Sequence, residues 1–261
     1  MDVASIGFLG FGKMAQSIAS GIGTTAKLHY FDPAPDDASL HATARKMNVA
    51  PAPTARELET GVDLLLLCVK PGDMARALST LEGNKSYITI AAGLSVDTVV
   101  SSLPNPSARV ARVMPNLGAT IAQSVSGVYC TDAALLKTTL SIFSSVGMAF
   151  QVQKEELLHA VTGLSGSGPA YAFLFLQSLG EAGILQGLPA EQSFEMAART
   201  VKAAMDLYLE NREHPGQWIT KVSSPGGTTI EGLATLEDHG FRAAVIRAVE
   251  AAAEKSRQLG G

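Results

Sequence analysis

The feature that most constrains the fold is a glycine-rich turn directly after a short apolar run near the N-terminus. Residues 4–9 (ASIGFL) are typical of a buried parallel strand, and residues 10–15 (GFGKMA) lead into apolar residues at helical spacing. In such a unit the first glycine permits the turn and the second lets backbone approach a pyrophosphate. The small residue Ala15 keeps the helix close to the strand. The pattern predicts a dinucleotide site at Gly10, Phe11, Gly12, Lys13 and Met14; a glycine-rich turn without a cofactor is the alternative.

A second strand, residues 27–31 (KLHYF), ends in Asp32. An acid at this spacing accepts hydrogen bonds from the adenosine ribose and repels a 2′-phosphate, which favours NADH. A plain turn before a proline is the alternative for Asp32. Three cations further on, Arg45, Lys46 and Arg56, can return toward a phosphate. The expected cofactor is therefore NADPH or NADH.

Further strand candidates lie at residues 63–69, 86–90 and 109–114, and the alternation of strands and helices through residue 150 predicts a Rossmann-type doubly wound parallel sheet. Such sheets bind ligands beyond the carboxyl ends of their strands. Lys70 lies in one of these loops, although a solvated lysine is its ordinary role. The small residues Ala91 and Ala92 would let a nicotinamide ring approach the backbone, and Asn116 follows the strand at 109–114.

Composition narrows the class of partner. The chain is 46% hydrophobic and 17% charged with a net charge of −4, so a nucleic acid or an anionic membrane is a poor fit and a small molecule a better one. Cys68 and Cys130 are too few for a disulfide framework or a zinc cluster, and the five histidines lack metal-ligand spacing, so no metal site is expected. The N-terminus lacks the basic start of a signal peptide. We therefore expect a cytoplasmic protein.

The composition changes from residue 154. Residues 170–179 are apolar almost all round, and the next helical stretch carries several alanines among residues 194–208. Such helices are expected to be buried against a second subunit, with an intrachain core as the alternative. The sequence therefore predicts a dinucleotide-binding domain at 1–153 and an all-helical dimerisation and substrate domain at 154–261.

Residues 222–232 (VSSPGGTTIEG) form a second glycine-rich segment that opens a helix. Thr228 and Glu231 have the spacing of a capping box. Backbone N–H groups at a helix start carry partial positive charge, so this segment is a candidate cradle for a small carboxylate or phosphate. An ordinary capped turn is the alternative.

Four stretches together resemble the pyrroline-5-carboxylate reductase family: residues 163–171 (GLSGSGPAY), 187–189 (GLP), 214–217 (HPGQ) and 223–233 (SSPGGTTIEGL). The last stretch carries the pattern SSPGGxTxxGL and is the most specific of them. The resemblance implies NAD(P)H-dependent reduction of 1-pyrroline-5-carboxylate to L-proline, the final step of proline biosynthesis. It also implies a homodimer or an oligomer of dimers.

The resemblance carries over to individual positions. It places Gly10, Phe11 and Gly12, with Val69, Lys70, Pro71, Ala91 and Ala92, at the cofactor, and Ser224, Gly226, Gly227, Thr228 and Thr229 at the substrate. Because residues 223–229 contain no titratable side chain, we expect backbone N–H groups around Gly227 and Thr228 to hold the substrate carboxylate. The catalytic candidate is the Thr229 hydroxyl, which would orient the imine nitrogen; a helix cap is its alternative role. The chain departs from the family pattern at Ala55, Leu117, Gly118 and Trp218.

Two other functions stay open on the sequence. A related two-domain reductase of β-hydroxyacids would need a catalytic lysine in the helical domain, for which Lys202 and Lys221 are the candidates. A non-catalytic NAD(P)-binding dimer that senses redox state would keep Gly10 and Gly12 but would not need the segment at 226–229.

Overall fold

The structure is a computed structural model that describes residues 3–33 and 37–259. The chain forms two compact units, one made of Met1–Ser167 with Val249–Gly261 and the other of Gly168–Ala248. The first unit thus contains residues 154–167 and the end of the last helix in addition to the strand-rich part. The two compact units meet in the chain between Ser167 and Gly168. The division into functional domains at 153/154, which the sequence suggested, stays a prediction.

The first unit is built on one sheet of eight strands within the described residues, in the order β3-β2-β1-β4-β5-β6-β7-β8. The strands are β1 Ser5–Leu9, β2 Lys27–Phe31, β3 Val49–Pro51, β4 Leu64–Leu67, β5 Ser86–Thr89, β6 Arg109–Met114, β7 Ser124–Tyr129 and β8 Gly147–Gln151. Strands β1 to β6 are parallel, as the sequence predicts. The parallel order ends at β6, because β7 runs antiparallel to β6 and β8 pairs in parallel with β7. Only residues 115–123 link β6 to β7, and a parallel return needs a crossover of about a dozen residues or more.

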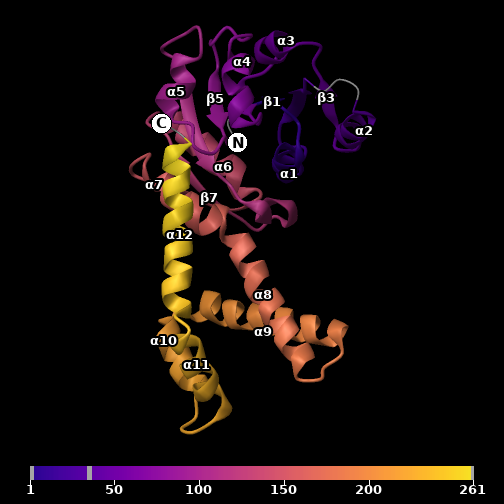
Figure 1. Ribbon diagram of the computed structural model, residues 1–261. Helices are drawn as coiled ribbons and strands as arrows, with labels where there is room; N and C mark the ends of the chain where they lie inside the picture. Colours follow the sequence, from indigo (N-terminus) through magenta and orange to yellow (C-terminus); the bar gives the residue numbers. More distant parts are fainter. Residues whose placement is uncertain (1–2, 34–36, 260–261) are drawn as a thin grey trace. The chain divides into compact units, whose positions relative to one another are not determined.

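Helices cover both faces of this sheet (Figure 1). They are α1 Lys13–Ile22, α2 Ala38–Lys46, α3 Ala55–Thr60, α4 Met74–Leu78, α5 Val96–Ser101 and α6 Ala133–Ser144. Strand β4 shows why the fold has two layers of core. Leu64 and Leu66 enter the apolar cluster under α1, α2 and α6, whereas Leu65 and Leu67 enter the cluster under α3, α4 and α5. A strand buried on both faces reads as the continuous apolar run seen in the sequence.

A short helix and a π-helical turn end the first unit. Helix α7 covers Leu157–Val161, and the π-helical turn η3 covers Thr162–Gly166. Part of the last helix, α12 (Phe241–Gln258), packs here: a Cβ added to Gly163 would lie 2.6 Å from the Val249 carbonyl oxygen. His159 Nδ1 and Ser256 Oγ are 2.9 Å apart. The helix expected to begin near Pro169 is therefore preceded by further helical residues, 157–166, which the sequence analysis did not predict.

The second unit is all helical, with α8 Gly168–Leu185, α9 Ala190–Asn211, α10 Pro215–Val222, α11 Thr228–Asp238 and the first part of α12. Figure 1 shows α8 and α9 crossing, and the Ser193 hydroxyl of α9 donates to the Gly180 carbonyl of α8 at 2.6 Å. Gly180 and Gly183 make this approach possible, because a Cβ on either would collide with Phe194 or Ser193.

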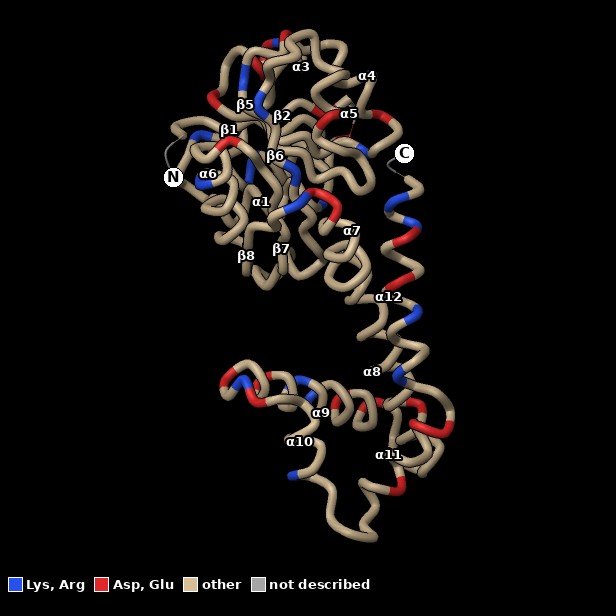
Figure 2. The backbone as a smooth tube through the Cα atoms, turned by 90° about the vertical axis from the view of Figure 1, so that its left-hand side faces the viewer, with Lys and Arg blue, Asp and Glu red and all other residues tan. Residues whose placement is uncertain are grey.

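Much of the apolar surface of the second unit is exposed in the single chain. Within 170–179, where all-round burial was expected, Phe173 is 60% and Leu174 65% exposed. Charged residues are frequent along α9, whereas α8 carries only Glu181 (Figure 2). No helix among the described residues is long and apolar enough to cross a membrane. An exposed apolar face of this kind is typical of a subunit interface.

Candidate functional site

The glycine-rich turn between β1 and α1 has the conformation that a dinucleotide cradle requires. Gly10 has φ +87°, and a Cβ on it would lie 3.0 Å from the Cys68 backbone, so no other residue fits without strain. Gly12 precedes α1 without a side-chain cap, and the space where its Cβ would stand is open. The N–H groups of Lys13 and Met14 begin the helix, and such groups have no acceptor within it. The residues present therefore fit a pyrophosphate at this helix start.

Asp32 and Phe11 hold the tip of this turn. The Asp32 carboxylate accepts the Phe11 N–H at 2.7 Å, which fixes the acid beside the turn at the carboxyl end of β2. The Phe11 ring is fully buried against Tyr30, with ring centroids 4.8 Å apart. Only the backbone of Phe11 is thus available to a cofactor. Asp32 lies where it can meet a ribose hydroxyl while it supports the turn.

A cavity of about 330 Å³ opens at the carboxyl ends of β1, β2 and β4. Its lining includes one residue from the end of each strand or just beyond it, namely Leu9, Phe31 and Val69. Ala55 of α3 and Ala77 of α4 complete its apolar walls. The cavity adjoins the turn and accommodates a flat, largely apolar ring such as adenine. Lys70 and Pro71 follow Val69, and Pro71 opens the short 3-10 helix η1, Pro71–Asp73.

The remaining expected cofactor residues follow β5 and β6. Ala91 is buried, and its N–H donates to Thr89 Oγ1 at 3.3 Å, whereas Ala92 is partly exposed. Asn116 has a structural task that the sequence did not reveal. Its amide donates to the Ser165 carbonyl at 3.0 Å and its oxygen accepts the N–H groups of Gly118 and Val125. It thereby ties the loop after β6 to the π-helical turn, and its contact with a cofactor stays a prediction.

The second glycine-rich segment lies in the helical unit. Residues 224–227 form a turn in which the Gly227 N–H donates to the Ser224 carbonyl at 3.1 Å. Gly226 has φ +65° and follows Pro225, the arrangement of a type II turn. A Cβ on Gly227 would collide with Ser224 Oγ. The Gly227 N–H is therefore used inside the turn. That N–H groups around Gly227 and Thr228 hold a substrate carboxylate stays a prediction.

The expected capping box is wrong. Helix α11 begins at Thr228 with Gly227 as its N-cap, and no side chain caps it. The helix thus starts one residue earlier than the pattern of Thr228 and Glu231 suggested. Its first N–H groups, those of Thr228, Thr229 and Ile230, have no acceptor within the helix. They form the candidate carboxylate cradle, and Thr228 and Thr229 are both exposed beside it.

The two lysines considered for a different reductase are held elsewhere. Lys202 pairs with Asp206 one helical turn away. Lys221 pairs with Glu213, and its ammonium group lies 4.4 Å from the centre of the Trp218 ring. Trp218, one of the departures from the family pattern, therefore packs against the lysine that precedes the turn.

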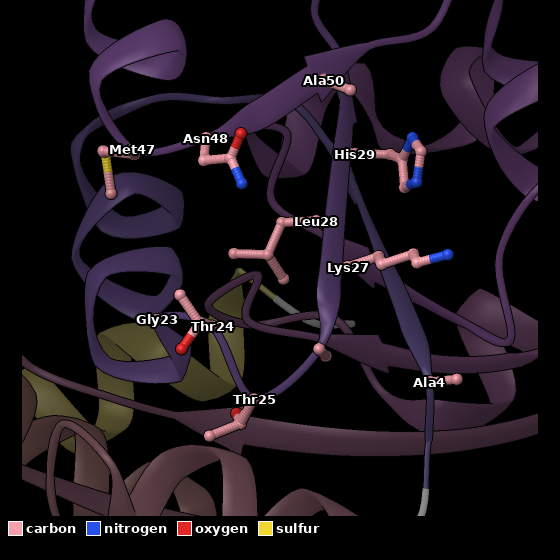
Figure 3. Close-up of a pocket in the computed structure, with 11 residues that line it drawn as sticks. Ala4, Gly23, Thr24, Thr25, Lys27, Leu28, His29, Met47, Asn48 and Ala50 are labelled. Atoms are coloured by element: carbon pink, nitrogen blue, oxygen red, sulfur yellow. The ribbon is translucent and has the colours of Figure 1, made fainter.

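The cavity shown in Figure 3 has a different location and character. It has about 550 Å³ and lies at the amino ends of β1 and β2, near Ala4 and Lys27. Lys27 and His29 point to one side of β2, whereas Asn48 and Thr24 lie on the other side, so the polar groups of this cavity do not converge. No three His, Cys, Asp or Glu side chains of residues 3–33 and 37–259 gather as metal ligands would.

Cys68 and Cys130 are free thiols. Burial raises the pKa of both, so neither is a nucleophile at neutral pH.

Two family models match the chain. The model described as pyrroline-5-carboxylate reductase dimerisation matches residues 155–259, and the model described as NADP oxidoreductase, coenzyme F420-dependent, matches residues 5–93. Residues 155–259 contain the turn at 224–227 and helix α11. Residues 5–93 contain the turn between β1 and α1. Each candidate cradle therefore lies within one of the matched regions.

Relatives align along the whole chain. Pyrroline-5-carboxylate reductase of Methanosarcina acetivorans is 38% identical, with 100% of this chain and 99% of the relative covered. The enzyme of the same name from Escherichia coli is 36% identical over 97% of each chain.

Solved structures agree with these relatives. A pyrroline-5-carboxylate reductase from Coxiella burnetii has a TM-score of 0.90 at 27% identity, with 99% of each chain covered. A Plasmodium falciparum pyrroline carboxylate reductase with NADP bound has a TM-score of 0.88 at 28% identity, with 100% of this chain and 99% of that chain covered. With its relatives, its dimerisation region and its fold in agreement, this chain belongs to the pyrroline-5-carboxylate reductase family.

Proposed function

We propose that this protein reduces 1-pyrroline-5-carboxylate to L-proline with NADPH or NADH, the final step of proline biosynthesis. Membership of the family supports the reaction. The observation that carries the proposal is the uncapped start of α11 behind the turn at 224–227. It offers several N–H donors to a small carboxylate in a segment without titratable side chains.

The turn between β1 and α1 supports the cofactor part of the proposal. Lys13 and Met14 would hold the pyrophosphate through their N–H groups, and Asp32 would hold the adenosine ribose. Val69, Lys70 and Pro71 would line the path of the dinucleotide, with Ala91 and Ala92 at the nicotinamide. When bound, NAD(P)H supplies the hydride that the reaction consumes.

The chemistry requires little of the protein beyond positioning. A cyclic imine protonated at nitrogen is already electrophilic at its ring carbon, so hydride addition yields the amine without a general acid. In the proposed site the N–H groups of Thr228, Thr229 and Ile230 hold the carboxylate. The Thr229 hydroxyl would accept the iminium N–H and so orient the ring. Ser224 and Gly226 shape the turn that leaves these groups accessible.

We also propose an assembly and a location. The dimerisation region and the exposed apolar side chains of α8 favour a homodimer, and an oligomer of such dimers would bury more of this surface. The two free cysteines favour a reducing compartment, consistent with the cytoplasm.

Oxidation of NADPH and of NADH on addition of 1-pyrroline-5-carboxylate tests the proposed reaction. Purified protein should oxidise at least one cofactor and release L-proline, identified by chromatography. A β-hydroxyacid with NAD⁺ or NADP⁺ serves as the comparison substrate for the other reductase class. Turnover of that substrate without turnover of the imine would overturn the proposal.

A further inference from the structure

Two arginines lie at the cavity beyond β1, β2 and β4. Arg56 comes from α3 and Arg76 from α4, and both line the cavity together with Pro33 and Thr80. Asp32 ends β2 directly before Pro33, but its carboxylate is bound to the Phe11 N–H at the glycine-rich turn. The cavity is therefore lined by two arginines from different helices and by Asp73, the partner of Arg76, while Asp32 precedes the lining residue Pro33.

Neither arginine is firmly held. Arg56 contacts Glu82 through Nε at 2.8 Å and Nη2 at 2.6 Å, and its side chain is 67% exposed. Arg76 contacts Asp73 at 2.9 Å and is 78% exposed. Ion pairs this exposed contribute little to stability, so their release is easy when a stronger anion arrives. A phosphate monoester is such an anion, because a guanidinium group can bind two of its oxygens at once.

We propose that Arg56 and Arg76 determine how the protein recognises the 2′-phosphate of its cofactor. They would attract this phosphate from α3 and α4 while Asp32 repels it from β2, so the protein binds both NADPH and NADH. The inference rests on the proposed use of a dinucleotide but requires only binding, not reduction of the imine. The two effects have opposite signs and can be separated by substitution.

Calorimetric titration with adenosine 2′,5′-bisphosphate and with ADP tests the inference without any reaction. The first probe carries the 2′-phosphate and the second does not. Arg56→Ala and Arg76→Ala should each weaken binding of adenosine 2′,5′-bisphosphate by about tenfold, the loss of one interaction with a charged group, and leave ADP binding nearly unchanged. Added salt should reduce the difference between parent and variants.

Arg199→Ala is the matched control, because Arg199 is 79% exposed and pairs with Glu195 in the other unit. It should bind both probes like the parent. Arg45→Ala tests the competing cation on α2, which lies near Tyr30. Equal affinity of parent, Arg56→Ala and Arg76→Ala for the bisphosphate would overturn the inference, as would a loss confined to Arg45→Ala.

The result also separates this inference from the proposed function. Arginine-dependent binding of the bisphosphate by a protein that fails to reduce 1-pyrroline-5-carboxylate would support the inference and contradict the function. Turnover of the imine with NADPH that neither arginine substitution changes would support the function and contradict the inference. Failure of the parent protein to bind either probe would contradict the inference.

Discussion

At the scale of single residues, Thr229 is the one side chain for which we propose a catalytic role. It lies in the first turn of α11, is exposed, and sits beside N–H groups that no side chain caps. Its hydroxyl is therefore separable by mutation from the backbone that would hold the substrate carboxylate.

Thr229→Ala should lower kcat/KM for the imine. Loss of one hydrogen bond to a charged group costs about 1.5 to 3 kcal/mol. That corresponds to a roughly ten- to hundredfold decrease, with cofactor affinity nearly unchanged. Thr229→Ser keeps the hydroxyl and should retain most of the activity. Steady-state kinetics of both variants, with thermal melting to verify folding, make the comparison. An alanine variant that melts and turns over like the parent would show that Thr229 has no part in catalysis.

Asp32 sets the other residue-scale prediction. Asp32→Ser should raise the efficiency with NADPH relative to NADH by roughly five- to tenfold, because a carboxylate near the 2′-phosphate is removed. Asp32 also accepts the Phe11 N–H at 2.7 Å, so the serine variant changes the support of the turn as well as the charge. Asp32→Asn keeps an acceptor oxygen there and should shift the cofactor ratio in the same direction. A ratio unchanged in both variants would contradict contact between Asp32 and the ribose.

At the scale of elements, the sequence predicted what depends on local pattern. The apolar run at 63–69 became β4 because both of its faces are buried, and the GFGKMA turn produced the open start of α1. Strand β7 was not predicted. Its antiparallel direction follows from the short link at 115–123 and not from its own residues. The start of α11 was misplaced by one residue. The turn at 224–227 leaves Gly227 in an extended conformation, which makes Gly227 and not Thr228 the N-cap of the helix. The bonds of Asn116 to Ser165 and Val125 could not be predicted, because they join segments distant in sequence.

The packing of α12 on α7 should depend on pH through His159. Burial, followed by the charges of Arg112 and Arg257, lowers the pKa of His159, although Glu155 and Glu156 oppose this. The folded protein therefore binds fewer protons here than the unfolded chain. This contribution to stability is present above the ordinary pKa of about 6.5 and is lost as the pH falls below it.

Melting temperatures across this pH range test that dependence. His159→Gln keeps a polar partner for Ser256 and should reduce the decrease in Tm on acidification. Ser256→Ala removes the 2.9 Å contact at every pH and should lower Tm with less effect on its slope. An identical pH profile for parent and His159→Gln would contradict the role of this histidine.

At the scale of the whole molecule, the helical unit leaves apolar side chains exposed that a second copy of the chain would cover. The sequence indicated this from residues 170–179, although it could not say which of their faces remain open. Phe173→Glu should place a charge in that surface and convert the protein from dimer to monomer in sedimentation at micromolar concentration. Met148→Glu is the control, because Met148 is similarly exposed at 62% but lies on β8 of the other unit. A dimer unaffected by Phe173→Glu would place the interface elsewhere.

An isotope experiment follows the hydride from the cofactor to the cyclic imine. The protein is incubated with 1-pyrroline-5-carboxylate and NADPH or NADH deuterated at both C4 positions of the dihydronicotinamide. We expect L-proline that carries one deuterium per molecule, on the ring carbon that is bonded to nitrogen but does not carry the carboxylate. Cofactor oxidation without deuterated L-proline, or no reaction with either cofactor, would contradict it.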